Sequence, residues 1–145
     1  MSLQNLLGIS LETISPDKAV VGKLLSAAQR NLEDAQLVGL SAENRFDAAY
    51  KAVMQLAIVA LHSHGYRTLT SKPGHHQTAL QTLTTSVGLP QSQVIVLDAL
   101  RKQRNLSDYS GDTVPDSTVV ACLDSADALM AHVKAWLEKN RPQLL

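Results

Sequence analysis

Residues 46–61 read FDAAYKAVMQLAIVAL, and this stretch decides the fold. Apolar side chains recur in it every three or four residues and cover most of the circumference of a helix rather than one stripe. A helix that is apolar on most sides is buried, so we expect it at the centre of the molecule. Ser41 to Asn44 suit its start and Gly65 its end, because glycine accepts the left-handed conformation that closes many helices.

The blocks on both sides of this stretch also have helical spacing. Ser15-Pro16-Asp17 is a typical helix opening, and the helix that follows should end near Gly39. Further helices are predicted over about 75–86 and over 90–109, although 94–96 alone would also suit a strand. A last helix carries residues 119–137 and frays after Lys139, and residues 1–14 form a short helical arm.

These elements predict one all-α domain over residues 1–145, an up-and-down bundle of four or five helices. Residues 66–74 and 114–116 read as loops because they contain glycine, proline or both. The chain has no Asn-Gly hairpin signal and no clear alternation of apolar and polar residues. We therefore do not expect a sheet.

Composition limits what the protein can do. The 145 residues include 45% apolar ones, enough for the core of one domain, and the formal net charge is +0 with only 3% aromatic residues. This balance disfavours a strongly basic or base-stacking nucleic-acid binder, so any contact with RNA or a nucleotide would be local. Cys122 is the single cysteine and so has no partner for an internal disulfide. The first basic residue is Lys18, so we do not expect a signal peptide, which begins with basic residues. The apolar run 54–61 is shorter than a membrane span. We expect a soluble, cytoplasmic protein.

Familiar cofactor and metal motifs are missing from the sequence. There is no Walker loop, GxGxxG, GxSxG, HExxH or cysteine pair. His62 and His64 are two residues apart, and His75 and His76 are adjacent, so neither pair has the spacing of ligands on one helix face. We predict no cofactor and no metal, and we interpret these histidines as exposed or capping side chains.

Residues 101–109, which read RKQRNLSDY, form the densest basic cluster of the chain. Arg104 and Asp108 are four residues apart and share a helical face. One interpretation is an ordinary surface ion pair. The alternative is a functional site, because Arg before Asp is the weaker order of such a pair and an anion in the last turn opposes the helix dipole.

The chain resembles the HEPN family in two places. Residues 44–50, NRFDAAY, look like the start of the second HEPN helix, and the later Arg-Asn-x-x-Asp-Tyr follows the family order of an Arg, a polar residue and then a His. Arg104 and Asn105 match this motif, whereas Tyr109 stands where the His is expected. The resemblance extends from about Pro16 to Leu137. It implies a helical bundle, commonly a homodimer, whose active relatives are metal-independent ribonucleases with Arg and His converging across the dimer.

The residue types qualify that expectation. Arg104 can hold two phosphate oxygens, and Asn105 can orient the phosphate. An unperturbed His titrates near pH 6.5 but a Tyr near 10, so only about one Tyr in a thousand is ionised at pH 7 and Tyr109 is a poor base. We therefore expect weak or absent ribonuclease activity, unless His75 or His76 takes the place of the missing His.

Three functions remain open from the sequence. The first is a HEPN-like module that binds a nucleotide, RNA or a partner protein; the resemblance implies a small nucleotidyltransferase as partner, in some relatives as a toxin–antitoxin pair. The second is a ribonuclease with a modified motif, in which Arg104 and Tyr109 would be catalytic. The third is a structural helical dimer. For the binding module the candidate ligand-binding residues are Arg104, Asn105, Asp108, Tyr109, Tyr50 and His75; Tyr50 on its own pattern is a core residue, and the resemblance brings it near the site.

Overall fold

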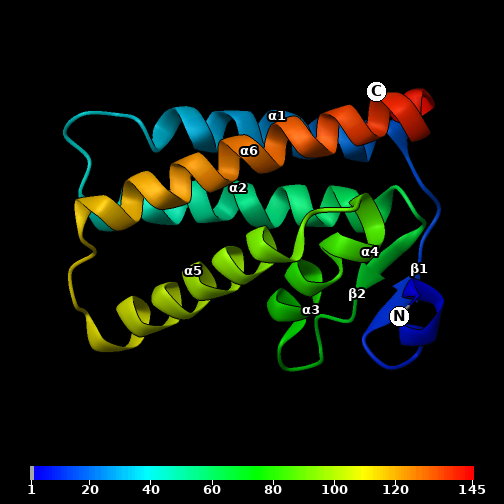
Figure 1. Ribbon diagram of the computed structural model, residues 1–145, viewed down its shortest axis with the longest axis horizontal. Coiled ribbons are helices and arrows are strands. Elements are labelled where there is room, and N and C mark those ends of the chain that lie inside the picture. Colours follow the sequence, from blue (N-terminus) through cyan, green and yellow to red (C-terminus); the bar gives the residue numbers. More distant parts are fainter. Residues whose placement is uncertain (1) are drawn as a thin grey trace.

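Helix α2 (Ala42–His62) runs through the middle of a helical bundle in the computed structural model, which describes residues 2–145 (Figure 1). The Ser41 Oγ accepts a hydrogen bond of 3.1 Å from the Asn44 backbone N–H and so caps its start. Phe46, Leu56 and Val59 are almost fully buried, and the buried side chains extend around most of the helix. The predicted central helix and the all-α bundle are confirmed.

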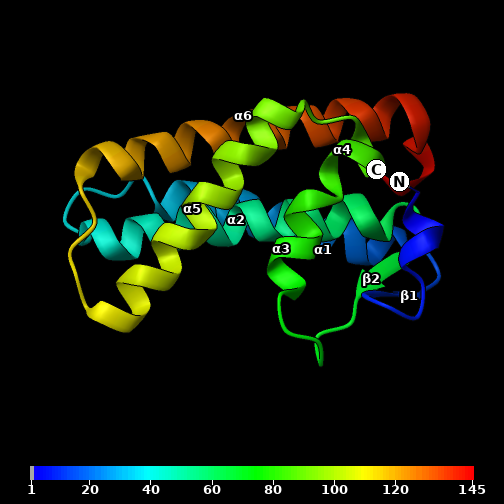
Figure 2. The same ribbon diagram turned by 60° about the horizontal axis from the view of Figure 1, so that its bottom comes forward.

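Two long helices cover α2. Helix α1 (Lys18–Asp34) and helix α6 (Asp116–Asn140) make the most extensive contacts with it, and neighbouring long helices run antiparallel (Figure 1). Helix α5 (Gln91–Ser110) runs obliquely to α2, as the turned view in Figure 2 shows. Short 3-10 helices, η1 (Leu3–Leu6) and η2 (Pro142–Leu144), lie near the two ends of the chain.

The predicted helix over 75–86 is two short helices, α3 (His75–Gln81) and α4 (Leu83–Val87). They meet at Thr82, whose Oγ1 donates a 3.0 Å hydrogen bond to the Ala79 carbonyl. A threonine hydroxyl that bonds the preceding turn in this way competes with regular helix hydrogen bonding. Helix α1 also differs, because it ends at Asp34 rather than near Gly39, and Asp17 rather than Ser15 caps its start.

A small antiparallel sheet contradicts the expectation that the chain has none. Strand β1 (Leu11–Thr13) pairs with strand β2 (Tyr66–Thr68), so the predicted arm over 1–14 is only partly helical. The pairing joins segments more than fifty residues apart, which a search for local hairpins does not detect. Gly65 (φ +84°) makes the turn out of α2, and its carbonyl accepts a 2.8 Å hydrogen bond from the Ile14 N–H.

None of the helices in residues 2–145 is both long enough and apolar enough to cross a membrane.

Candidate functional site

Three elements meet beside the exposed side of α2. Helix α5 is anchored by Val94, Leu97 and Leu100 in its first half, whereas its last two turns carry mostly exposed side chains. The start of α3 packs against both α2 and α5. Side chains from α2, α3 and α5 therefore converge, and Tyr50, His76 and Arg104 form their centre, which we call the Tyr50 cluster.

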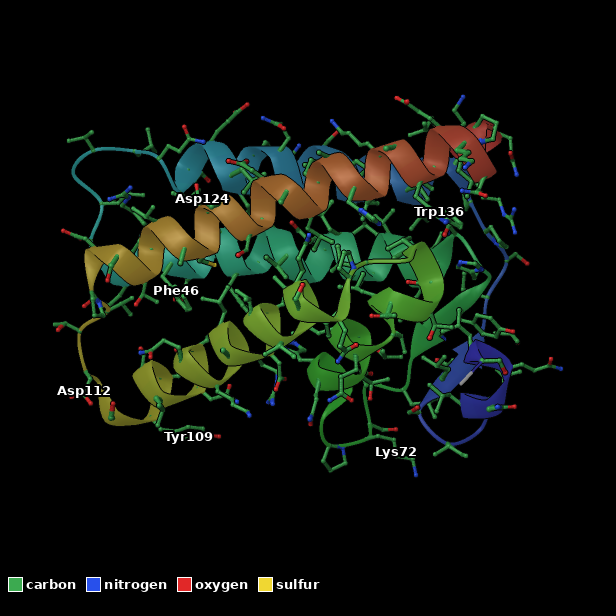
Figure 3. The ribbon with its side chains drawn as sticks, in the orientation of Figure 1. Phe46, Lys72, Tyr109, Asp112, Asp124 and Trp136 are labelled. Atoms are coloured by element: carbon green, nitrogen blue, oxygen red, sulfur yellow. The ribbon has the colours of Figure 1, made fainter. Side chains whose placement is uncertain are left out.

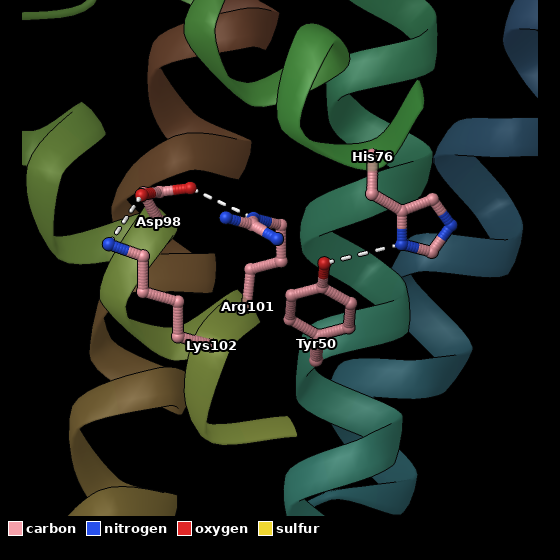
Figure 4. Close-up of polar contacts among 5 residues, drawn as sticks. All are labelled: Tyr50, His76, Asp98, Arg101 and Lys102. Atoms are coloured by element: carbon pink, nitrogen blue, oxygen red, sulfur yellow. Dashed lines mark hydrogen bonds and ion pairs between the residues drawn. The ribbon is translucent and has the colours of Figure 1, made fainter. Parts of the chain in front are cut away.

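Tyr50 is the buried member of this cluster. Its side chain is only 2% exposed, and its hydroxyl lies 3.4 Å from the Nδ1 of His76 (Figure 4). Burial raises the pKa of the Tyr50 hydroxyl to about 12, although Arg104 opposes the shift. The hydroxyl therefore stays protonated at neutral pH and holds the imidazole in position.

Arg104 lies across the ring of Tyr50. The centre of its guanidinium is 5.2 Å from the ring centroid, which is the distance of a cation–π contact. Its ion pair with Asp108 is loose, with 3.7 Å between Nε and the Asp108 Oδ2. The guanidinium is thus held by an aromatic face while most of its N–H groups remain open to another acceptor.

Arg101, one turn earlier on α5, forms a different and closer ion pair. Its Nε donates a 2.9 Å hydrogen bond to the Asp98 Oδ1, and both side chains are largely covered. Lys102 reaches the other oxygen of the same carboxylate at 3.5 Å (Figure 4). Together these cations and their hydrogen bonds lower the pKa of Asp98, against the raising effect of its burial. Arg101 is therefore chiefly a structural cation.

His76 lies close to Arg104 and Arg101. Burial lowers its pKa below 6.5, and His75, Arg104 and Arg101 lower it further. The ring of His75 stands edge-on to that of His76, with 4.7 Å between centroids. His76 is consequently neutral at pH 7, so that one ring nitrogen can donate a hydrogen bond and the other can accept one.

A groove of about 460 Å³ opens beside the cluster. Arg104 and His76 line it together with one face of α2, whose members are Asp47, Tyr50, Lys51, Met54, Gln55 and Ile58. A smaller hollow of about 200 Å³ lies beside His75, Arg101 and Asn105 and shares His76 with the groove. The volume of the groove is in the range of small-molecule sites.

The charges around the cluster nearly cancel. Arg101 and Lys102 pair with Asp98, Arg104 lies near Asp108 and Asp47, and Lys51 of α2 also lines the groove. Burial raises the pKa of Asp47, the nearby Asp108 raises it further, and Arg104 opposes both. An anion would therefore be held by directed hydrogen bonds rather than by a broad positive field.

Tyr109 lies apart from the other predicted site residues. The fold brings Arg104 onto Tyr50, pairs Asp108 with Arg104, and places Asn105 and His75 around the smaller hollow. Tyr109 is 92% exposed and lines neither cavity; its side chain points outward from the end of α5 (Figure 3). Five residues along a helix turn a side chain by about 140°, so Tyr109 cannot share the face of Arg104.

His76 and Asp47 were not among the predicted ligand-binding residues. For His76 there was a signal in the sequence, since it follows Lys72-Pro73-Gly74 at the start of a helix. Asp47 gave none, because only the packing of α5 against α2 brings it near Arg104. In the part of the chain that the structure describes, no three His, Cys, Asp or Glu side chains are grouped to hold a metal ion.

The remaining histidines serve the fold. The Nε2 of His62 accepts a 2.9 Å hydrogen bond from the Asp17 N–H at the start of α1. His64 and His132 contact the carbonyls of Ser86 and Val87, both at 2.6 Å, around the end of α4.

Comparisons with models of known protein families, with curated protein sequences and with solved structures gave no match to this chain.

Proposed function

We propose that this chain binds the phosphate group of a nucleotide or of RNA at the Tyr50 cluster. The observation that carries the proposal is the placement of Arg104, stacked on a buried tyrosine ring and only loosely paired with Asp108. A guanidinium fixed in this way loses little further freedom when its N–H fork meets two phosphate oxygens. The neutral imidazole of His76 adds one more hydrogen-bond donor beside it.

The resemblance to HEPN domains supports the same ligand class. It also leads us to propose a homodimer and a small nucleotidyltransferase as partner, as in the toxin–antitoxin pairs of that family. The exposed side chains of Leu106 and Tyr109 at the end of α5 are 63% and 92% accessible and suit a protein contact. Light scattering of the wild type and of Leu106→Asp tests the dimer, which the aspartate should weaken.

Metal-independent RNA cleavage is the second candidate function, and His76 is the observation that favours it. The expected difficulty was a missing base, because Tyr109 replaces the motif histidine. His76 lies in the cluster with a pKa below 6.5 and can accept the proton of a ribose 2′-hydroxyl. This role requires that Nδ1–H donate to the Tyr50 oxygen, which leaves Nε2 unprotonated.

Calorimetric titration with 5′-AMP and with a short single-stranded RNA tests the binding function. We expect saturable binding that weakens as salt concentration rises, since phosphate contacts depend on ionic strength. Arg104→Gln should remove most of the affinity while the far-ultraviolet circular dichroism stays unchanged. If neither probe binds in low salt, the proposed function is wrong.

A fluorogenic RNA incubated with excess chelator separates binding from cleavage. Cleavage by the wild type that disappears in both Arg104→Gln and His76→Asn would support the second candidate. Binding without cleavage leaves the first. Residual cleavage that survives both substitutions would point to a contaminating nuclease and count against the second candidate.

A further inference from the structure

The groove beside the Tyr50 cluster continues along α2 past the residues that would hold a phosphate. Met54 and Ile58 lie one and two turns beyond Tyr50 on the same face, and Ile58 is 39% exposed. The backbone positions of Tyr50 and Ile58 are roughly 12 Å apart along the helix axis. This separation is similar to the reach of a mononucleotide from its phosphate to the far edge of its base.

The groove is chemically different at its two ends. Arg104, His76 and the Tyr50 hydroxyl mark the polar end, whereas Met54 and Ile58 give the other part an aliphatic wall. Gln55 lines this wall, and its Oε1 accepts a 2.8 Å hydrogen bond from the Asn31 Nδ2 of α1. Within residues 2–145 no hydrogen bond occupies the Gln55 Nε2, so its N–H groups are free to meet an acceptor on a ligand.

We propose that this wall is a nucleobase subsite, so that the groove takes a nucleoside monophosphate unit with its phosphate at Arg104 and its base against Met54 and Ile58. The inference rests on the proposed function, because the phosphate anchors the ligand. A base has a flat apolar face that covers the aliphatic side chains and ring acceptors that the Gln55 amide can reach. The wall side chains Met54, Gln55 and Ile58 are uncharged, although Lys51 lines the groove one turn before Gln55.

The test is a calorimetric comparison of 5′-AMP with ribose 5-phosphate on the full chain. The two probes share the phosphate and the sugar, and only AMP carries a base. We expect AMP to bind about tenfold more tightly, which is about 1.4 kcal/mol. That gain corresponds to about 55 Å² of apolar surface removed from water.

Two variants test whether the additional affinity for AMP comes from contacts with this wall. Ile58→Asn should bring AMP affinity down to that of ribose 5-phosphate and leave ribose 5-phosphate binding unchanged. Ile95→Asn is the matched control, since Ile95 is also an exposed helical isoleucine but lines neither cavity of the cluster. It should change neither affinity. Circular dichroism confirms that both variants are folded.

The possible failures are distinguishable. If the wild type binds AMP and ribose 5-phosphate equally, the base makes no contact and the subsite is refuted while phosphate binding stands. The same holds if Ile58→Asn folds and keeps the full preference for AMP. If neither probe binds, the subsite is refuted, and the proposed function fails with it when the short single-stranded RNA does not bind either.

Discussion

Arg101 and Arg104 are one turn apart on α5, and the structure predicts that replacing them has opposite consequences. Arg101 is bonded to Asp98 at 2.9 Å with side chains only 15% and 18% exposed. Arg104 is paired with Asp108 at 3.7 Å, where the side chains are 34% and 51% exposed. The first pair is structural, and the second leaves its arginine available to a ligand.

The magnitudes follow from these geometries. A hydrogen bond to a charged group contributes about 1.5–3 kcal/mol, and Lys102 retains part of it, so Arg101→Gln should lower the free energy of unfolding by about 1–2 kcal/mol. An exposed pair contributes about 0.5 kcal/mol, so Arg104→Gln should cost about 1 kcal/mol or less, its cation–π contact included. For AMP binding the order reverses: Arg104→Gln should lose about ten- to a hundredfold in affinity, and Arg101→Gln at most about threefold.

Urea denaturation followed by circular dichroism measures the stability, and calorimetry with AMP measures the affinity. Arg104→Lys is an informative companion, because it keeps the charge but loses the planar fork and the stacking on Tyr50; an intermediate affinity is expected. Equal losses of affinity in Arg101→Gln and Arg104→Gln would refute the reasoning, since a general electrostatic effect would then explain binding. So would an Arg104→Gln protein that binds AMP like the wild type.

Three further predictions concern the fold and its titratable groups. Gly65→Ala should lower the melting temperature, because φ is +84° there and an added Cβ would lie 3.2 Å from the Ile14 carbonyl oxygen, whereas Gly22→Ala in α1 meets no atom within 4 Å and should raise it; equal shifts of the same sign would contradict this. The lowered pKa of His76 means that the unfolded chain binds more protons below pH 6.5, so the free energy of unfolding should fall as the pH drops through that range, and a His76→Asn protein with an undiminished slope in urea titrations would argue against it. Burial raises the pKa of the Cys122 thiol to about 12, so a thiol reagent at pH 8 should modify it only in denaturant, and rapid labelling of the folded protein would disagree.

The helices were predictable where one local signal decided them. The apolar spacing of residues 46–61 predicted α2, and Gly65 marked its end within three residues. The predicted start of a helix was wrong where two residues could each cap it, as with Ser15 and Asp17 before α1. The sheet was missed because its two strands have only three residues each and are separated in the sequence by α1 and α2.

The candidate site, like the fold, was predictable from the sequence only in part. The sequence pointed to residues 101–109 as the chemically unusual stretch, and its helical spacing related Arg104 to Asp108. It could not indicate that Arg104 would face Tyr50 and His76, although helical spacing already separates Tyr109 from the face of Arg104. That information lies in how α5 packs against α2.

The sequence by itself determined that this protein is a helical bundle around one apolar helix, because helix formation depends on periodicity that can be read over a few turns. Only the tertiary structure decided which polar groups meet. The approach of α3 and α5 to α2 brings His76 and Arg104 to a buried tyrosine, and it depends on side-chain packing between segments far apart in the chain. A short motif therefore indicated the candidate site, and the packing of α3 and α5 on α2 determined which residues meet there.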